Sequence, residues 1–200
     1  MDKALKFVSY RGAEIESVFE DLGKLRIAVF KDYPYLYEGT LEHEMEYLKI
    51  YSSAPKSFVF GVYDGSEMVG ATTCIPLSEE TSEVQKPFIE AGYDIEKIFY
   101  FGESILLPAY RGKGIGHRFF DEREAHASSF GSYDYTAFCS VDRGEKHPLK
   151  PLDYRPNDAF WLKRNYSKKN DLVCEMTWLD VDNSEPTSKP LIFWMKGSRG

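Results

Sequence analysis

The chain has 200 residues, of which 42% are hydrophobic and 16% aromatic, so it can build the core of a single domain (residues 1–200) and cannot be a disordered chain. The net charge is −7 and no run of Lys and Arg occurs, which excludes nucleic acid as an expected partner. No segment has the apolar length of a signal peptide or of a membrane helix, so we expect no membrane contact.

Three cysteines, Cys74, Cys139 and Cys174, lie far apart within apolar runs. An odd and scattered set is typical of reduced thiols and favours a cytoplasmic location over a disulfide framework or a zinc site. The zinc-protease pattern H-E-x-x-H is absent as well, and the sequence predicts no metal site.

The first half of the chain predicts one strand, two helices and a hairpin. Apolar residues recur at three- and four-residue steps after Ile15, the period of a helix with one buried face, and Pro34 ends that helix. Asp64-Gly65 lies between two strand-like runs and predicts a tight turn. In chain order, we expect a strand over 4–10, helices over 15–30 and 41–51, and a β-hairpin over 57–77.

The second half adds a short helix over 84–91, a long strand over 97–108, a glycine-rich loop, a helix over 115–128 and a strand over 133–141. A long loop over 142–156 then leads to a helix over 156–169 and to strands over 172–181 and 190–196. Hairpins outnumber crossovers in this order. The sequence therefore predicts a mixed α/β domain of the α+β type, with a largely antiparallel sheet flanked by helices.

The loop RGKGIG fails two phosphate-binding templates. A P-loop requires Ser or Thr after its lysine, whereas Lys113 is followed by Gly114. The dinucleotide fingerprint would place its last glycine at His117. The pattern that remains is R-x-x-G-x-G, with Arg111, Gly114 and Gly116 between a strand and a helix.

Glycines allow a backbone to curl around an anion, and the amino end of the following helix adds a positive field. A pyrophosphate is therefore a natural ligand for this loop. The alternative is a tight turn that only lets the helix pack on the sheet.

At this point the sequence resembles the GNAT superfamily of N-acetyltransferases, in which R-x-x-G-x-G after a strand of the type L-L-P-x-Y is the acyl-CoA signature. A second segment, PNDAFWLKRNY, is a looser match to the N-x-x-A-x-x-F-Y-x-K-x-G-F pattern of that family. The resemblance implies a GNAT-like fold and acetyl-CoA as the acyl donor. The expected cofactor-binding residues are Leu106, Leu107, Arg111, Gly112, Lys113, Gly114, Ile115, Gly116, His117, Asn157 and Phe160.

The resemblance also implies transfer to an amine acceptor, a small molecule or a peptide, through a direct ternary complex. Homodimers are frequent in the family. Cys139 is interpreted as a small buried hydrophobe rather than as the site of an acyl enzyme. The alternative function is a non-catalytic acyl-CoA-binding sensor or partner module of the same fold. The acceptor, the acyl chain length and the oligomeric state are left open.

Glu103 is the candidate base, because it lies in the apolar stretch FYFGESILL, where burial should raise the pKa of its carboxyl. GNAT enzymes often carry a glutamate on this strand. Strict alternation places Glu103 on the face opposite Leu106, unless a bulge changes the parity. The alternative is a carboxylate that pairs with a buried arginine or lysine.

The general acid is unassigned. Many relatives carry a tyrosine where this chain has Trp161, and indole is not a useful acid at neutral pH. Tyr154 and Tyr166 are the nearest tyrosines in sequence, and Tyr154 is the candidate. Unassisted departure of the CoA thiolate is the alternative.

In the family, the connector between the first two helices often covers the acceptor site. In this chain it contains Tyr33, Tyr35 and Tyr37, framed by acidic residues. Aromatic faces and carboxylates both favour ammonium groups, which predicts a lining for a small cationic or aromatic amine. The alternative is a set of tyrosines that pack a helix corner.

Overall fold

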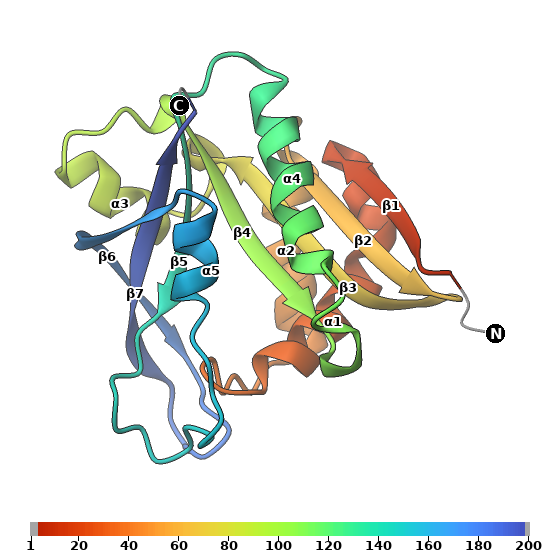
Figure 1. The fold of residues 1–200 in the computed structure, drawn as a ribbon, viewed down its shortest axis with the longest axis vertical. Coiled ribbons are helices and arrows are strands. Elements are labelled where there is room, and N and C mark those ends of the chain that lie inside the picture. Colours follow the sequence, from red (N-terminus) through yellow and green to blue (C-terminus); the bar gives the residue numbers. More distant parts are fainter. Residues whose placement is uncertain (1–3, 199–200) are drawn as a thin grey trace.

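A computed structural model describes residues 4–198, and one seven-stranded sheet runs through it (Figure 1). The strand order is β1-β2-β3-β4-β5-β7-β6, and every neighbouring pair is antiparallel except β4 and β5. The strands are β1 (Lys6–Arg11), β2 (Phe58–Asp64), β3 (Glu67–Pro76), β4 (Ile98–Leu106), β5 (Tyr135–Val141), β6 (Ser167–Trp178) and β7 (Thr187–Gly197). The predicted α+β class with a largely antiparallel sheet is confirmed.

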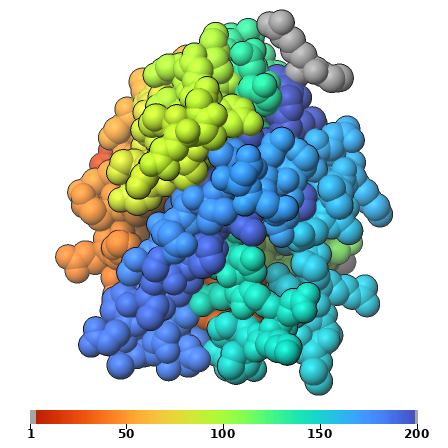
Figure 2. All heavy atoms as spheres, turned by 90° about the vertical axis from the view of Figure 1, so that its left-hand side faces the viewer, coloured from red at the N-terminus to blue at the C-terminus, as the bar shows by residue number. Residues whose placement is uncertain are grey.

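Helices cover both faces of this sheet. They are α1 (Phe19–Phe30), α2 (Leu41–Ser53), α3 (Ser82–Glu90), α4 (Ile115–Ser128) and α5 (Asp158–Lys163). α1 and α2 share one apolar cluster with the sheet, and α4 shares a second cluster on the opposite face. Figure 1 shows α4 in front of the sheet and α1 and α2 behind it. Figure 2 shows α3 beside the C-terminal strands, where it packs against β6. Within residues 4–198, no helix is long and apolar enough to cross a membrane.

The helix expected over 156–169 is shorter than predicted. α5 ends at Lys163, and Asn165 has a left-handed φ of 67° that stops the helix. Ser167 then pairs with Met195, so β6 begins five residues before the expected strand. Tyr166, which is 1% exposed, anchors this turn in the core. Burial of one large side chain thus outweighs the helical preference of the lysines that follow.

A bulge interrupts the pairing of β4 with β3. Thr72 pairs with Ser104 and Cys74 pairs with Phe101, so Gly102 and Glu103 together face a single residue of β3. Upstream of Glu103, the bulge changes which side chains of β4 point to each face of the sheet. From Glu103 onward the alternation is regular, and Glu103 therefore lies on the face opposite Leu106.

β4 and β5 separate along their length. They pair only between Ile98–Tyr100 and Tyr135–Ala137, and beyond Ala137 β5 pairs with β7 alone. Figure 1 shows the two parallel strands close together at one end and apart at the other. The second half of β4 consequently has one edge that no strand covers.

Candidate functional site

The uncovered edge of β4 presents backbone groups of Leu106. The N–H of Leu107 donates to the carbonyl of Val69 on β3, at 3.0 Å. Because successive amides of a strand point in opposite directions, the N–H of Leu106 points to the uncovered edge. Arg111 Nε donates to the carbonyl oxygen of Leu106, at 3.0 Å. Of the two predicted cofactor residues on this strand, Leu107 therefore has its N–H engaged in the sheet, and only the N–H of Leu106 points to the uncovered edge.

The glycine loop follows this edge and leads into α4. Gly112 and Gly114 have φ angles of +77° and +79°, and nothing lies within 4 Å of where a Cβ would be at either position. Only glycine adopts these angles without strain. Gly114 is the N-cap of α4 and no side chain caps this end. The first amides of α4, including those of Ile115 and Gly116, have no helical acceptor, which is the arrangement that suits an anion.

The predicted cofactor residues outside the loop lie beside it. The ring of His117 meets that of Phe160 on α5, with 4.8 Å between centroids, and Phe160 lies 3.9 Å from a Cβ built on Gly116. Lys113 Nζ lies 5.3 Å from the centroid of the Tyr110 ring. Asn157 precedes α5 and its side chain makes no capping hydrogen bond. The structure therefore brings the two predicted segments together at the amino end of α4.

The tyrosines considered as general acid differ in their surroundings. Tyr166 is buried, and its hydroxyl lies 2.9 Å from Thr136 Oγ1, so it belongs to the core. Trp161 packs against Phe138 at 5.0 Å between centroids. Tyr154 is half-buried and meets Tyr33 edge-on at 4.7 Å, and burial raises the pKa of its hydroxyl.

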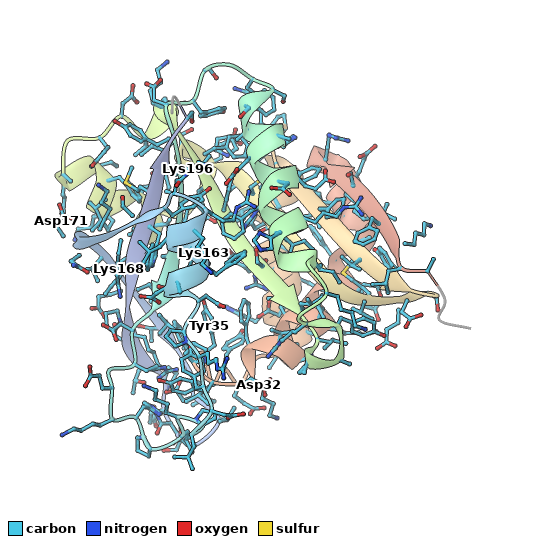
Figure 3. All side chains as sticks on the ribbon, in the orientation of Figure 1. Asp32, Tyr35, Lys163, Lys168, Asp171 and Lys196 are labelled. Carbon is cyan, nitrogen blue, oxygen red and sulfur yellow. The ribbon has the colours of Figure 1, made fainter. Side chains whose placement is uncertain are left out.

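A cavity of about 200 Å³ lies on the opposite face of the sheet, between α1, α2 and the strands β4–β7. Tyr35 and Tyr37 of the connector line it, whereas Tyr33 lies outside it against Tyr154. Tyr35 is labelled in Figure 3. The remaining wall is largely aromatic and aliphatic, and includes Phe30, Tyr47, Val84, Tyr100, Met176, Trp178 and Leu191. Three carboxylates, Glu44, Glu80 and Glu103, and one guanidinium, Arg26, also line it.

Arg26 connects two of these carboxylates. Its Nη1 donates to Glu103 Oε1 and its Nε donates to Glu44 Oε2. Burial works against the positive charge, but Glu103, Tyr47 and Glu44 outweigh it and hold the pKa of Arg26 well above its ordinary value. The hydroxyl of Tyr37 donates to Glu44 Oε1 at 2.7 Å. Glu103 therefore pairs with an arginine, which the sequence analysis gave as the alternative to a role as base.

Glu80 is the third carboxylate, and it lacks such a pair. It is 6% exposed, and Oε1 has no hydrogen-bond partner among residues 4–198. Burial is the main cause that raises the pKa of Glu80 to about 7. The negative charge of Glu103 adds to it, while the N–H of Thr81, the charge of Arg26 and the hydroxyl of Tyr51 oppose it.

Sequence reasoning missed Arg26 and Glu80 as members of the site. Arg26 lies within the amphipathic pattern of α1 as one more polar residue, and Glu80 lies in the polar run SEETSE. The partners of Arg26 are distant in sequence, 18 residues away for Glu44 and 77 residues away for Glu103. No local spacing could have identified them.

Known proteins were compared with this chain. No family model matches the sequence, and no curated protein sequence matches it. Solved structures do match. An N-acetyltransferase from Staphylococcus aureus Mu50 aligns with a TM-score of 0.60 at 11% identity, over 98% of this chain and 100% of its own.

An aminoglycoside 6'-N-acetyltransferase complexed with coenzyme A aligns with a TM-score of 0.57 at 14% identity, over 96% of this chain and 98% of its own. PaiA N-acetyltransferase from Thermoplasma acidophilum, in complex with coenzyme A, aligns with a TM-score of 0.56 at 10% identity, over 98% of this chain and 99% of its own. The chain thus has the fold of GNAT N-acetyltransferases over nearly its whole length, as its motifs predicted.

Proposed function

We propose that the protein is an N-acetyltransferase that moves an acetyl group from acetyl-CoA to an amine, a small molecule or a peptide, in one ternary complex. One observation carries this proposal: the gap between β4 and β5 lies between two features that suit the two substrates. The glycine loop and the uncapped start of α4 lie on one face of the sheet, and an acidic, aromatic cavity lies on the other. A thioester on a long flexible arm can pass through such an opening, with its phosphates at the loop and its acyl group at the cavity.

The donor would be held by the loop and by the edge of β4. The free amides at the start of α4 suit the pyrophosphate, with Arg111 and Lys113 adding positive charge. The N–H of Leu106 is available for the pantetheine arm or for the thioester oxygen. A donor placed at the developing oxyanion stabilises the transition state by about 3–4 kcal/mol.

The cavity suits a small amine that is cationic or aromatic. Glu44, Glu80 and Glu103 oppose a single guanidinium, that of Arg26, so the wall carries an excess of carboxylates. The rings of Tyr35 and Tyr37 present flat surfaces that also attract an ammonium group.

The reaction needs a neutral amine. Its nitrogen attacks the thioester carbon, the C–N bond forms, the C–S bond breaks, and CoA leaves as the thiol once a proton reaches its sulfur. The base and acid that the sequence predicts are Glu103 and Tyr154. Cys139 Sγ lies 3.1 Å from the hydroxyl of Tyr100, within the wall of the cavity, and transfer without a cysteine intermediate is the simpler route.

The first experiment is isothermal titration with acetyl-CoA, with CoA and ATP as comparisons. We expect micromolar binding of acetyl-CoA and much weaker binding of ATP, and acetyl-CoA at about 100 times its Kd should stabilise the fold by about 2.7 kcal/mol. Absence of acetyl-CoA binding would leave the glycine loop as a packing turn and refute the proposal.

A second measurement separates an enzyme from an acyl-CoA sensor. Amine-dependent release of thiol from acetyl-CoA is expected for the wild type, and Glu103→Gln should lower turnover while acetyl-CoA affinity is kept. Binding without thiol release would favour the sensor. A cytoplasmic location, supported by free cysteines at 74, 139 and 174, and a homodimer are parts of the same proposal.

A further inference from the structure

Hydrogen bonds of the Glu80 backbone fix the position of this residue at the wall of the cavity. It follows a single helical turn, Leu77–Glu79, at the end of β3, and its N–H donates to the carbonyl of Leu77 at 3.1 Å. Gln85 Nε2 donates to the carbonyl of Glu80 at 2.7 Å. Both backbone polar groups of Glu80 are therefore engaged, and the residue is positioned by the chain around it.

The two carboxylate oxygens of Glu80 differ. Oε2 accepts the N–H of Thr81 at 2.8 Å, while Oε1 is buried and has no hydrogen-bond partner among residues 4–198. Buried polar atoms are almost always paired, because an unpaired one has lost its water without compensation. An oxygen left unpaired at the wall of a cavity therefore indicates a proton or a ligand that approaches from the cavity.

Among residues 4–198, no surrounding group donates a hydrogen bond to Oε1, although the nearby hydroxyl of Tyr51 and the charge of Arg26 both lower the pKa of Glu80. The guanidinium of Arg26 donates to Glu44 and Glu103, and the structure gives it no hydrogen bond to Glu80. The other ionisable groups of the wall and its backing come from four segments: Tyr35 and Tyr37 from the connector, His43, Tyr47 and Tyr51 from α2, Tyr100 from β4 and Cys139 from β5. Glu80 is thus the carboxylate of the cavity with which Arg26 forms no ion pair.

We propose that Glu80 is the base that takes the proton from the ammonium form of the acceptor inside the cavity. This inference rests on the proposed acetyl transfer and assigns its first step. The N–H bond of the ammonium breaks, the proton goes to Glu80 Oε1, and the nitrogen keeps the electron pair. The neutral amine then attacks the thioester carbon, and the second nitrogen proton leaves with the thiolate as CoA thiol. Glu80 returns its proton to water before the next turnover.

The environment of Glu80 suits this step. Burial is the main reason that the pKa of the Glu80 carboxyl is raised to about 7. Near neutral pH the group can therefore both accept a proton and release it. Glu103 differs, because Oε1 of Glu103 is occupied by Arg26. Glu80 therefore replaces Glu103 as the base in this proposal, and Glu103 positions Arg26 and keeps a negative charge beside Glu80, so that Glu103→Gln still lowers turnover.

The test compares the wild type with Glu80→Gln, Glu80→Asp and the control Glu79→Gln. Glu79 is the neighbouring residue and is exposed, so its variant removes the same charge outside the cavity. Phenethylamine and hexylamine serve as aromatic and aliphatic probe amines. Thiol release from acetyl-CoA is measured from pH 5.5 to 9.5, and acetyl-CoA affinity is measured by titration to show that each variant is folded.

We expect kcat of the wild type to rise with pH through an apparent pKa near 7. Glu80→Gln should lower kcat at pH 7 by about 100-fold or more, the usual contribution of a general base, with unchanged acetyl-CoA affinity. Its activity should recover only toward pH 9.5, where the amine, with a pKa of about 10 like that of lysine, begins to lose its proton unaided. Glu80→Asp should keep the rise near neutral pH, and Glu79→Gln should behave as the wild type.

Two results would overturn this inference while leaving acetyl transfer intact. One is a Glu80→Gln variant with the pH profile and kcat of the wild type. The other is a variant with a raised KM for the amine and an unchanged kcat and profile, which would make Glu80 an anchor for the ammonium only. A wild type that releases no thiol with either amine would overturn the proposed function and this inference together.

Discussion

The guanidinium of Arg143 meets the carboxylate of Asp180 through two hydrogen bonds of 2.7 and 2.9 Å, and both side chains are buried. The same guanidinium donates to the carbonyl oxygens of Pro34, at 2.7 Å, and Tyr35. One arginine thus ties the connector that lines the cavity to the end of β6. The predicted loop over 142–156 begins with this anchor.

Arg143→Ala should destabilise the protein. Breaking a buried pair costs about 3–5 kcal/mol, and we expect the lower end because Lys189 Nζ, 3.1 Å from Asp180, remains as a partner. A loss of about 3 kcal/mol corresponds to a fall in Tm of roughly 6–12 °C for a chain of this size. Urea and thermal unfolding measure it, with Arg155→Ala, at an exposed position, as the control. Equal effects of the two variants would contradict the anchoring role.

Arg26→Met should destabilise the protein by about 3–5 kcal/mol at pH 7.5, because Glu44 and Glu103 are left buried and charged. These carboxyls would then bind protons more readily in the folded than in the unfolded chain, so the loss should shrink as the pH falls toward 5. Urea unfolding at both pH values checks this. Lys24→Met, on the exposed side of the same helix, should change stability by less than about 1 kcal/mol. A loss independent of pH would argue against the charge explanation.

Gly114→Ala should weaken acetyl-CoA binding. A side chain at the left-handed φ of Gly114 costs about 1–2 kcal/mol and disturbs the first amides of α4. Gly131→Ala is the matched control, since Gly131 also has a left-handed φ of +64° with open space around it, beyond the other end of α4. Both variants should lose similar stability, but only Gly114→Ala should lose affinity in a titration. Equal affinities would place the ligand elsewhere.

Glu80 should make the fold less stable as the pH rises. Its pKa is raised from 4.5 to about 7 on folding, so the folded chain binds the extra proton between these values. The associated stability is fully present below pH 4.5 and is lost by about pH 7, amounting to roughly 3 kcal/mol. Glu80→Gln lacks this loss, and the difference between the two unfolding free energies, measured at pH 5 and pH 8, isolates it. Glu79→Gln should follow the wild type; a constant difference between wild type and Glu80→Gln would show that Glu80 titrates normally.

The local elements were largely predictable. The helix after Ile15 and the turn at Asp64-Gly65 follow from apolar period and turn chemistry, which act over a few residues. The helix expected over 156–169 is the exception, because packing of Tyr166 in the core ends it early. The position of the bulge, upstream of Glu103 so that Glu103 stays opposite Leu106, depends on pairing with β3, and no property of β4 alone determines it.

The α+β class, the GNAT-like order of elements and the glycine loop follow from the amino-acid sequence alone, because each depends on neighbouring residues: apolar period, turn dipeptides and the left-handed angles that only glycine adopts freely. Which carboxylates of the cavity pair with Arg26 follows only from the tertiary structure. Arg26 donates hydrogen bonds to Glu44 and Glu103, whereas Glu80 Oε1 has no hydrogen-bond partner among residues 4–198. Electrostatic pairing acts through space between residues far apart in the chain, so only the folded arrangement shows which carboxylate is free to accept a proton.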